Sequence, residues 1–209
     1  MSGSGGFLRT GELLYGLVIA VDIEAFSKLG VLEQAAAQVL LAQVLDEAAS
    51  AAGLDREDWY RQPRGDGELA VLPGHVDVAW VMARFIHHLA HALDRLPSDS
   101  RPHANLRLRV AMHHGPLTAG QFGPVGTAPI VACRLLDARQ TKAALAADPG
   151  CRLVLVISRQ LFQDVVATRF HGLLPERFRP IRALIKGTVY IGHVCLGSPM
   201  GELADPVGA

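Results

Sequence analysis

Two aspartates stand where a buried strand and a tight turn would bring their carboxylates together. Asp22 ends a dense apolar run that begins at Leu13, and Asp66 lies in an Arg-Gly-Asp-Gly turn. Two carboxylates a few ångströms apart repel each other, and a divalent cation between them removes that repulsion. The pair predicts an oxygen-rich site for Mg²⁺ or Mn²⁺ that would hold a triphosphate. Taken singly, each aspartate is better explained as a solvent-facing strand end or turn residue.

Hydrophobic periodicity predicts the elements that would position this pair. Strands are expected over 13–22, 59–63, 69–72, 106–113 and 153–157, helices over 31–52, 76–96, 127–147 and 159–167, and a closing hairpin over 181–196. This order predicts an α+β fold: a ferredoxin-like (βαββαβ) core sheet with helices packed on one side and a C-terminal extension. In such a sheet the first strand lies centrally beside the hairpin, so Asp22 and Asp66 can converge on one edge.

Length and composition indicate one compact domain. The chain has 209 residues, 50% of them hydrophobic and 19% charged, which excludes a mostly disordered protein or a coiled-coil rod. We expect a flexible lead over 1–12, the folded domain over 13–197 and a flexible tail over 198–209. Twenty basic and twenty acidic residues balance, so no nucleic-acid partner is expected. No apolar stretch is long enough for a membrane span, and three scattered cysteines suit reduced thiols in the cytoplasm.

Five segments resemble the motifs of class III nucleotidyl cyclases. Residues 21–27 (Val-Asp-Ile-Glu-Ala-Phe-Ser) resemble the first metal motif of the family, and Gly65-Asp66 resembles the second. Residues 112–120 are similar to its strand and glycine-rich turn, residues 126–135 to the helix that follows, and Lys186-Gly187 with Tyr190 to its late phosphate-binding segment. The segments occur in the family's order and cover residues 14–196.

The resemblance implies a cyclase homology domain that converts a nucleoside triphosphate into a 3′,5′-cyclic nucleotide and pyrophosphate. It implies that two Mg²⁺ or Mn²⁺ ions are held by Asp22, Asp66 and the backbone at Ile23. Arg134 would stabilise the transition state. Phosphates would be bound by Lys186 and by the segment after the first strand, at Phe26 and Ser27. The resemblance also implies a homodimer with shared sites at the two-fold interface.

The base-reading positions depart from the family's pattern. The second such position falls near Gln62, beside Arg64 and the Gly65-Asp66 pair, and residues 123–126 hold no acid. Ile130 stands where the family has an asparagine that orients the ribose. The substrate is therefore open among ATP, GTP, CTP and UTP. A pyrimidine substrate would match the stand-alone pyrimidine cyclases of bacterial phage-defence systems and would imply an antiviral role for this chain.

Two alternative functions are open besides an active cyclase. A catalytically silent pseudo-cyclase, acting as a dimeric nucleotide-binding regulatory module, is favoured by Ile130. An unrelated ferredoxin-like binding domain would make both aspartates structural. Outside these motifs, His87, His88 and His91 could bind a transition metal or simply form a solvated helix face, and His113-His114 could contact substrate or fill a turn.

Overall fold

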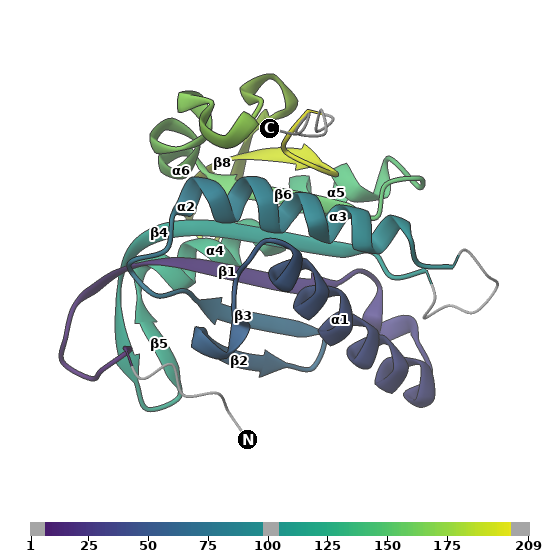
Figure 1. The fold of residues 1–209 in the computed structure, drawn as a ribbon, viewed down its shortest axis with the longest axis horizontal. Helices are drawn as coiled ribbons and strands as arrows, with labels where there is room; N and C mark the ends of the chain where they lie inside the picture. The colour runs from purple at the N-terminus through teal and green to yellow at the C-terminus, as the bar shows by residue number, and fades with distance from the viewer. Residues whose placement is uncertain (1–6, 98–104, 202–209) are drawn as a thin grey trace, which may run out of the picture.

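The structure of the chain, a computed structural model, describes residues 7–97 and 105–201. Within these ranges eight strands form one sheet in the order β2-β3-β1-β4-β6-β8-β7, with β5 paired to β4 alone (Figure 1). The strands are β1 (Leu14–Ile23), β2 (Tyr60–Arg64), β3 (Gly67–Val71), β4 (Leu108–Gly120), β5 (Gly123–Gly126), β6 (Leu153–Ser158), β7 (Arg179–Ile185) and β8 (Thr188–Leu196).

Helices connect these strands. They are α1 (Val31–Ala51), α2 (Val78–Trp80), α3 (Ile86–Asp94), α4 (Thr127–Asp137), α5 (Arg139–Ala146) and α6 (Arg159–Asp164). A π-helical segment, Val81–Phe85, joins α2 to α3, and short 3₁₀ turns follow β1 (Phe26–Lys28), precede β2 (Arg56–Asp58) and link α6 to β7.

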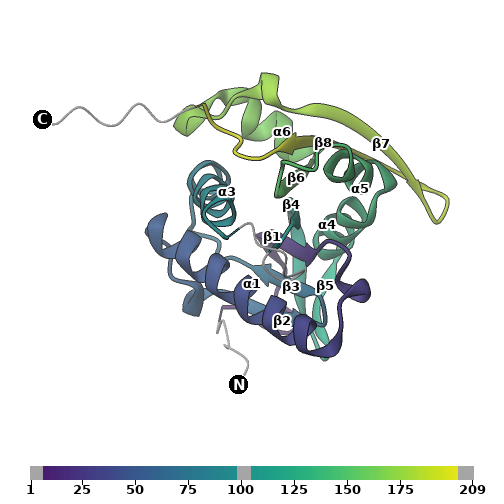
Figure 2. The same cartoon turned by 90° about the vertical axis from the view of Figure 1, so that its right-hand side faces the viewer.

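The predicted ferredoxin-like core is confirmed by strands β1 to β4. Strand β1 is central and runs antiparallel to both β3 and β4, and β2 pairs with β3 as a hairpin. Helices α1 and α3 pack on one face of this core (Figure 2). Side chains alternate along β1, so Ile19 and Val21 face α1 and α3, whereas Ala20 and Asp22 face away from them.

The opposite face of the sheet is covered by α4 and α5. These two helices lie outside the predicted ferredoxin-like core, whose helices pack on one side only. Leu135 of α4 and Leu145 of α5 form a second buried cluster with Val18 and Ala20 of β1. The C-terminal extension continues the sheet: β6 pairs parallel to β4, and the β7-β8 hairpin adds antiparallel to β6. Asp22 therefore lies on the face that α4 covers.

The predicted helix boundaries are partly wrong. The helix expected over 127–147 is two helices, because Ala138 is non-helical (φ −58°, ψ 135°). The helix expected over 76–96 starts at Val78, where Asp77 caps the first turn, and contains the π-helical segment. Periodicity detects the buried faces of such segments but not a single residue that breaks the backbone hydrogen bonds.

Two further differences concern the ends of elements. Strand β4 continues to Gly120 and turns into β5, whereas the predicted strand ends at His113. Residues 198–200, which the sequence analysis assigned to the tail, pack on the domain: Met200 is buried and pairs with Leu173, and the Ser198 hydroxyl bonds to His87. Residues 202–209 of that tail and the first six residues lie outside the described ranges. No helix of the described chain is long and apolar enough to cross a bilayer.

Candidate functional site

Asp22 lies one residue before the end of β1, in a row of residues that crosses four strands. Its neighbour on β4 is Arg109 and its neighbour on β3 is Gly67, which in turn pairs with Arg64 of β2. The row places Arg64, Asp22 and Arg109 on the same face of the sheet, since directly paired residues share a face. Asp22 is only 7% exposed.

The hairpin that carries Asp66 is held against the end of β1. The Ile23 N–H donates to the Asp66 carbonyl at 2.8 Å, and the Gln38 side chain of α1 donates to the Gly65 carbonyl at 2.7 Å. Gly67 permits this close approach, because a Cβ there would lie 1.9 Å from the Val21 carbonyl oxygen. The exposed Asp66 side chain is near enough to act on Asp22 electrostatically.

Arg109 neutralises Asp22. Its Nε donates to Oδ1 of Asp22 at 2.6 Å and its Nη2 to Oδ2 at 3.0 Å, a bidentate pair. Burial raises the pKa of Asp22 above its ordinary value; the bonds and charge of Arg109 oppose this rise, and the charges of Asp66 and Asp137 add to it. Sequence reasoning missed Arg109, although its place in the alternating strand 106–113 shows that it shares a face with Ala111.

A cavity of about 500 Å³ opens beside this row, between β2, the β4-β5 hairpin and α4. Its size is within the range of small-molecule sites. Arg134 and Ile130 project into it from the same side of α4, one helical turn apart. The lining residues are Gln62, Arg64, Leu69, Phe122, Pro124, Val125, Gly126, Pro129, Ile130, Cys133, Arg134 and Asp137. Two predicted substrate contacts, Gln62 and Arg64, thus share a cavity with the predicted catalytic Arg134.

Gln62 is held at one end of this cavity by the β4-β5 turn. Its side-chain amide N–H donates to the Phe122 carbonyl at 2.8 Å. Gly123 (φ +124°) makes room for the amide, because a Cβ there would lie 2.6 Å from the Gln62 Oε1. Phe122 itself is 88% exposed, an unusual position for a large aromatic side chain. Sequence reasoning missed Phe122, for which no local pattern exists.

The remaining predicted residues near Asp22 take different positions. The Ile23 side chain is buried among α1 and α3, so only its backbone faces the site. Phe26 and Ser27 form the 3₁₀ turn after β1; Phe26 packs against the core and Ser27 is exposed. Their roles toward phosphate stay predictions.

Lys186 lies far from this cavity within one chain. It is exposed at the tip of the β7-β8 hairpin, in a left-handed conformation (φ 49°), and β7 is the sheet edge opposite to β2 (Figure 2). The structure therefore does not bring Lys186 together with Asp22, Asp66 and Arg134 in a single copy.

The histidines that sequence reasoning left open have structural partners. His113 is buried, and its Nδ1 lies 2.7 Å from the Ser158 hydroxyl. Burial lowers the pKa of His113 to about 4, so the ring is neutral at physiological pH. His87, whose Nδ1 lies 2.9 Å from the Ser198 hydroxyl, joins His88 and His91 in a ring cluster on α3. Within the described residues, no group of three or more possible ligand side chains surrounds a common metal position.

Comparison with known proteins identifies the fold. No protein-family profile and no curated protein sequence matches the chain. Among solved structures, the guanylate cyclase domain of RhGC from Catenaria anguillulae, in complex with GTP, has 17% identity and a TM-score of 0.58 over 90% of this chain and 100% of that one. The guanylyl cyclase Cya2 has 13% identity and a TM-score of 0.62, covering 93% and 97%. An adenylate/guanylate cyclase/hydrolase from Silicibacter pomeroyi has 19% identity and a TM-score of 0.60, covering 91% and 100%.

The chain folds like the catalytic domains of class III adenylyl and guanylyl cyclases. At these identities the likeness concerns the fold; the reaction must be argued from the residues themselves.

Proposed function

We propose that this chain is a nucleotidyl cyclase that acts as a homodimer with Mg²⁺ or Mn²⁺. It would convert a nucleoside triphosphate into a 3′,5′-cyclic nucleotide and pyrophosphate. The observation that carries the proposal is that the turn with Asp66 is hydrogen-bonded to the end of β1 beside Asp22, close enough for the charge of Asp66 to act on Asp22. A cavity lined by Arg134, Arg64 and Gln62 lies next to this strand end. The likeness to cyclase catalytic domains, which covers 90% and 93% of this chain in two comparisons, supports the same reaction class.

The donor set suits a hard divalent cation. The Asp22 and Asp66 carboxylates and the Ile23 carbonyl provide only oxygen ligands, and Mg²⁺ is usually held by one or two carboxylates together with substrate phosphates. The charge of Asp66 acts on Asp22, and such repulsion favours a cation between the two groups. Bound there, two ions would activate the ribose 3′-hydroxyl and neutralise the β- and γ-phosphates.

The chain's own residues would stabilise the transition state and contact the phosphates and the base. Arg134 would donate to the α-phosphate oxygens, whose negative charge grows when the ribose 3′-oxygen attacks the α-phosphorus. The bond from that phosphorus to the β-phosphate oxygen breaks, pyrophosphate leaves, and the 3′-hydroxyl proton passes to water. Arg109, which lies beside Asp22, would add positive charge next to the phosphates. Gln62 presents a neutral amide to the base.

The homodimer would bring two residues to each pair of aspartates: Arg134 from α4 of the second copy, and Lys186. Lys186 lies on the opposite sheet edge from Gln62, so in one copy it cannot reach a triphosphate at Asp22. Large apolar side chains are exposed on both segments concerned: Phe122 and Ile130 around the cavity, and Leu184 on the β7-β8 hairpin. A second copy that covers these surfaces would remove them from water and complete the site. The proposal includes a cytoplasmic location, where nucleoside triphosphates are supplied.

The second candidate function is a nucleotide-binding pseudo-cyclase. Ile130, 51% exposed in the cavity, offers no hydrogen bond to a ribose, and Arg109 occupies both oxygens of Asp22. Both observations favour a chain that binds nucleotide without turnover.

A substrate panel separates the two candidates. The purified chain is incubated with ATP, GTP, CTP or UTP, each with Mg²⁺ and with Mn²⁺, and products are identified by mass spectrometry; Asp66→Asn serves as the matched inactive variant. We expect a cyclic nucleotide from at least one of the four triphosphates, and the same panel decides between purine and pyrimidine substrates. Tight triphosphate binding without any cyclic product would reject the enzyme and support the pseudo-cyclase.

A further inference from the structure

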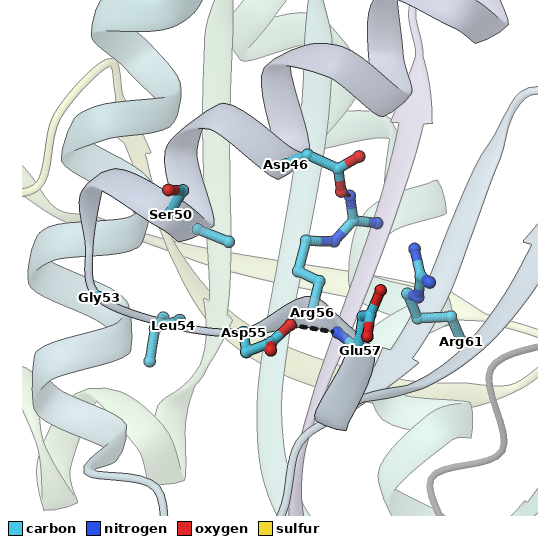
Figure 3. Close-up of a pocket in the computed structure, with 9 residues that line it drawn as sticks. Asp46, Ser50, Gly53, Leu54, Asp55, Arg56, Glu57 and Arg61 are labelled. Atoms are coloured by element: carbon cyan, nitrogen blue, oxygen red, sulfur yellow. Dashed lines mark hydrogen bonds and ion pairs between the residues drawn. The ribbon is translucent and has the colours of Figure 1, made fainter.

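A second cavity, of about 530 Å³, lies on the face of the sheet opposite to the candidate active site. It is bounded by the C-terminal half of α1, the 3₁₀ turn Arg56–Asp58 and the edge strand β2 (Figure 3). Its lining residues are Asp46, Ala49, Ser50, Gly53, Leu54, Asp55, Arg56, Glu57 and Arg61. Neither the fold's likeness to cyclases nor the proposed reaction uses this cavity.

One wall of the cavity holds a buried arginine with an unused donor. The Arg56 side chain is 5% exposed; its Nη1 pairs with Asp46, and its Nη2 donates to both oxygens of Glu68 at 2.7 and 2.9 Å. Its Nε–H is buried without a hydrogen-bond partner, and so is the Nε–H of Arg61. Both Nε atoms are closed off from the cavity, so the donors that a ligand there can reach are the terminal N–H groups of Arg61, which make no hydrogen bond within the described residues.

The charges around the cavity are not compensated within the described part of the chain. Arg61 makes no ion pair there, whereas Arg56 has two. On the acidic side, Asp55 accepts from the Glu57 N–H but neither carboxylate pairs with a basic group of the described residues. Figure 3 shows Arg61 on β2, Ser50 near the end of α1, and Asp55 beside Glu57 in the 3₁₀ turn between them. The cavity thus offers a cation and two anions to one ligand.

We propose that this cavity binds a free α-amino acid. The ligand carboxylate would accept from the Arg61 guanidinium, and its ammonium group would donate to Asp55 and Glu57. Ala49 and Leu54 provide apolar surface for the ligand side chain. This inference does not depend on the proposed function.

The cavity is structurally connected to the hairpin that carries Asp66. A neighbouring cavity of about 340 Å³ shares Arg56 and Arg61 with it and extends to Gly67 and Glu68. A ligand in the cavity therefore lies beside Arg56, the same side chain that holds Glu68, two residues after Asp66.

Isothermal titration calorimetry of the full chain tests the proposal. The probes are the standard free amino acids, titrated to about 10 mM, and the N-acetyl and methyl-ester forms of each one that binds. We expect at least one free amino acid to bind, and both blocked forms to bind at least about tenfold more weakly, because each lacks one charged hydrogen-bonding group.

Two variants locate the binding. Arg61→Ala removes a half-buried side chain that has no partner among the described residues, so it should fold, and it should weaken binding at least about tenfold. Arg182→Ala, a matched change on the exposed strand β7, should leave binding unchanged. The proposal is overturned if no free amino acid binds, if the blocked forms bind as well as the free ones, or if Arg61→Ala binds like Arg182→Ala.

Discussion

Arg109 and Asp22 face each other directly across β4 and β1, and the guanidinium binds both carboxylate oxygens. The pair is largely buried, with the two side chains 13% and 10% exposed. The predicted metal ligand is thus already neutralised by a cation that belongs to the protein. Any divalent ion at Asp22 must compete with Arg109, so the strength of this ion pair limits how tightly the proposed site can bind a cation.

Arg109→Ala should destabilise the fold by about 3 kcal/mol at pH 7, because it leaves Asp22 buried without its partner. Burial then raises the pKa of Asp22 further, so the loss should shrink as the pH falls and the carboxylate is protonated. Urea denaturation at pH 7 and pH 4.5 measures both effects. Adding Asp22→Asn to Arg109→Ala should recover part of the stability; equal losses in the single and double variants would show that the two residues are not coupled.

Ile130→Asn should increase cyclase turnover by at least about tenfold, since the amide can hold the ribose with a hydrogen bond made in the transition state. The side chain is 51% exposed, so the stability should change by less than about 0.5 kcal/mol. Steady-state kinetics with the substrate identified by the panel measures kcat and KM. Ile130→Gln, a polar residue of different length, is the control. A kcat equal to that of the unchanged chain would exclude a ribose-orienting role for this position.

Mixing Asp22→Asn with Arg134→Ala tests the shared site. If each site takes its aspartates from one copy and its arginine from the other, a heterodimer has one intact site. Random exchange makes half of the dimers mixed, so activity should recover to about one quarter of the unchanged chain. Each variant alone should be inactive. Mixed samples that stay as inactive as the separate variants, although subunit exchange is demonstrated by mass, would place both residues in one copy.

His113→Asn should flatten the pH dependence of stability between pH 6.5 and pH 4. Burial lowers the pKa of His113 to about 4, below its ordinary value of 6.5. The unfolded chain therefore binds a proton in this window that the folded chain does not, so stability falls as the pH falls. The loss attributable to His113 is about 1 kcal/mol between pH 6 and pH 5.

Asn can still donate to the Ser158 hydroxyl but does not titrate. Guanidinium denaturation across the pH range measures the slope. His75→Asn, the same substitution at an exposed loop position, is the variant with which the slope of His113→Asn is compared. Parallel curves for His113→Asn and the unchanged chain would contradict a buried neutral histidine.

The central strand and its neighbouring hairpin could be predicted from sequence because their signals are local. The apolar run ending in Asp22 indicates a buried strand, and the Arg-Gly-Asp-Gly turn indicates a hairpin with Asp66 near its tip. Both elements are present, and the α+β core that follows from their order is confirmed.

The partners of these residues depend on register between distant segments, which no local pattern encodes. Arg109 is 87 residues from Asp22, and only the pairing of β1 with β4 places them opposite each other. The same holds for Gln62, whose amide is held by the Phe122 carbonyl 60 residues away.

Sequence by itself therefore determined the strand that carries Asp22, the hairpin that carries Asp66 and the layered core around them, because alternation and turn chemistry act over a few residues. Tertiary structure alone decided that Arg109 neutralises Asp22, that Lys186 lies on the opposite sheet edge, and that Arg56 and Arg61 border one cavity with unused N–H groups. These relationships arise when strands and helices distant in the chain pack together, and packing decides which charges meet and which remain without a partner.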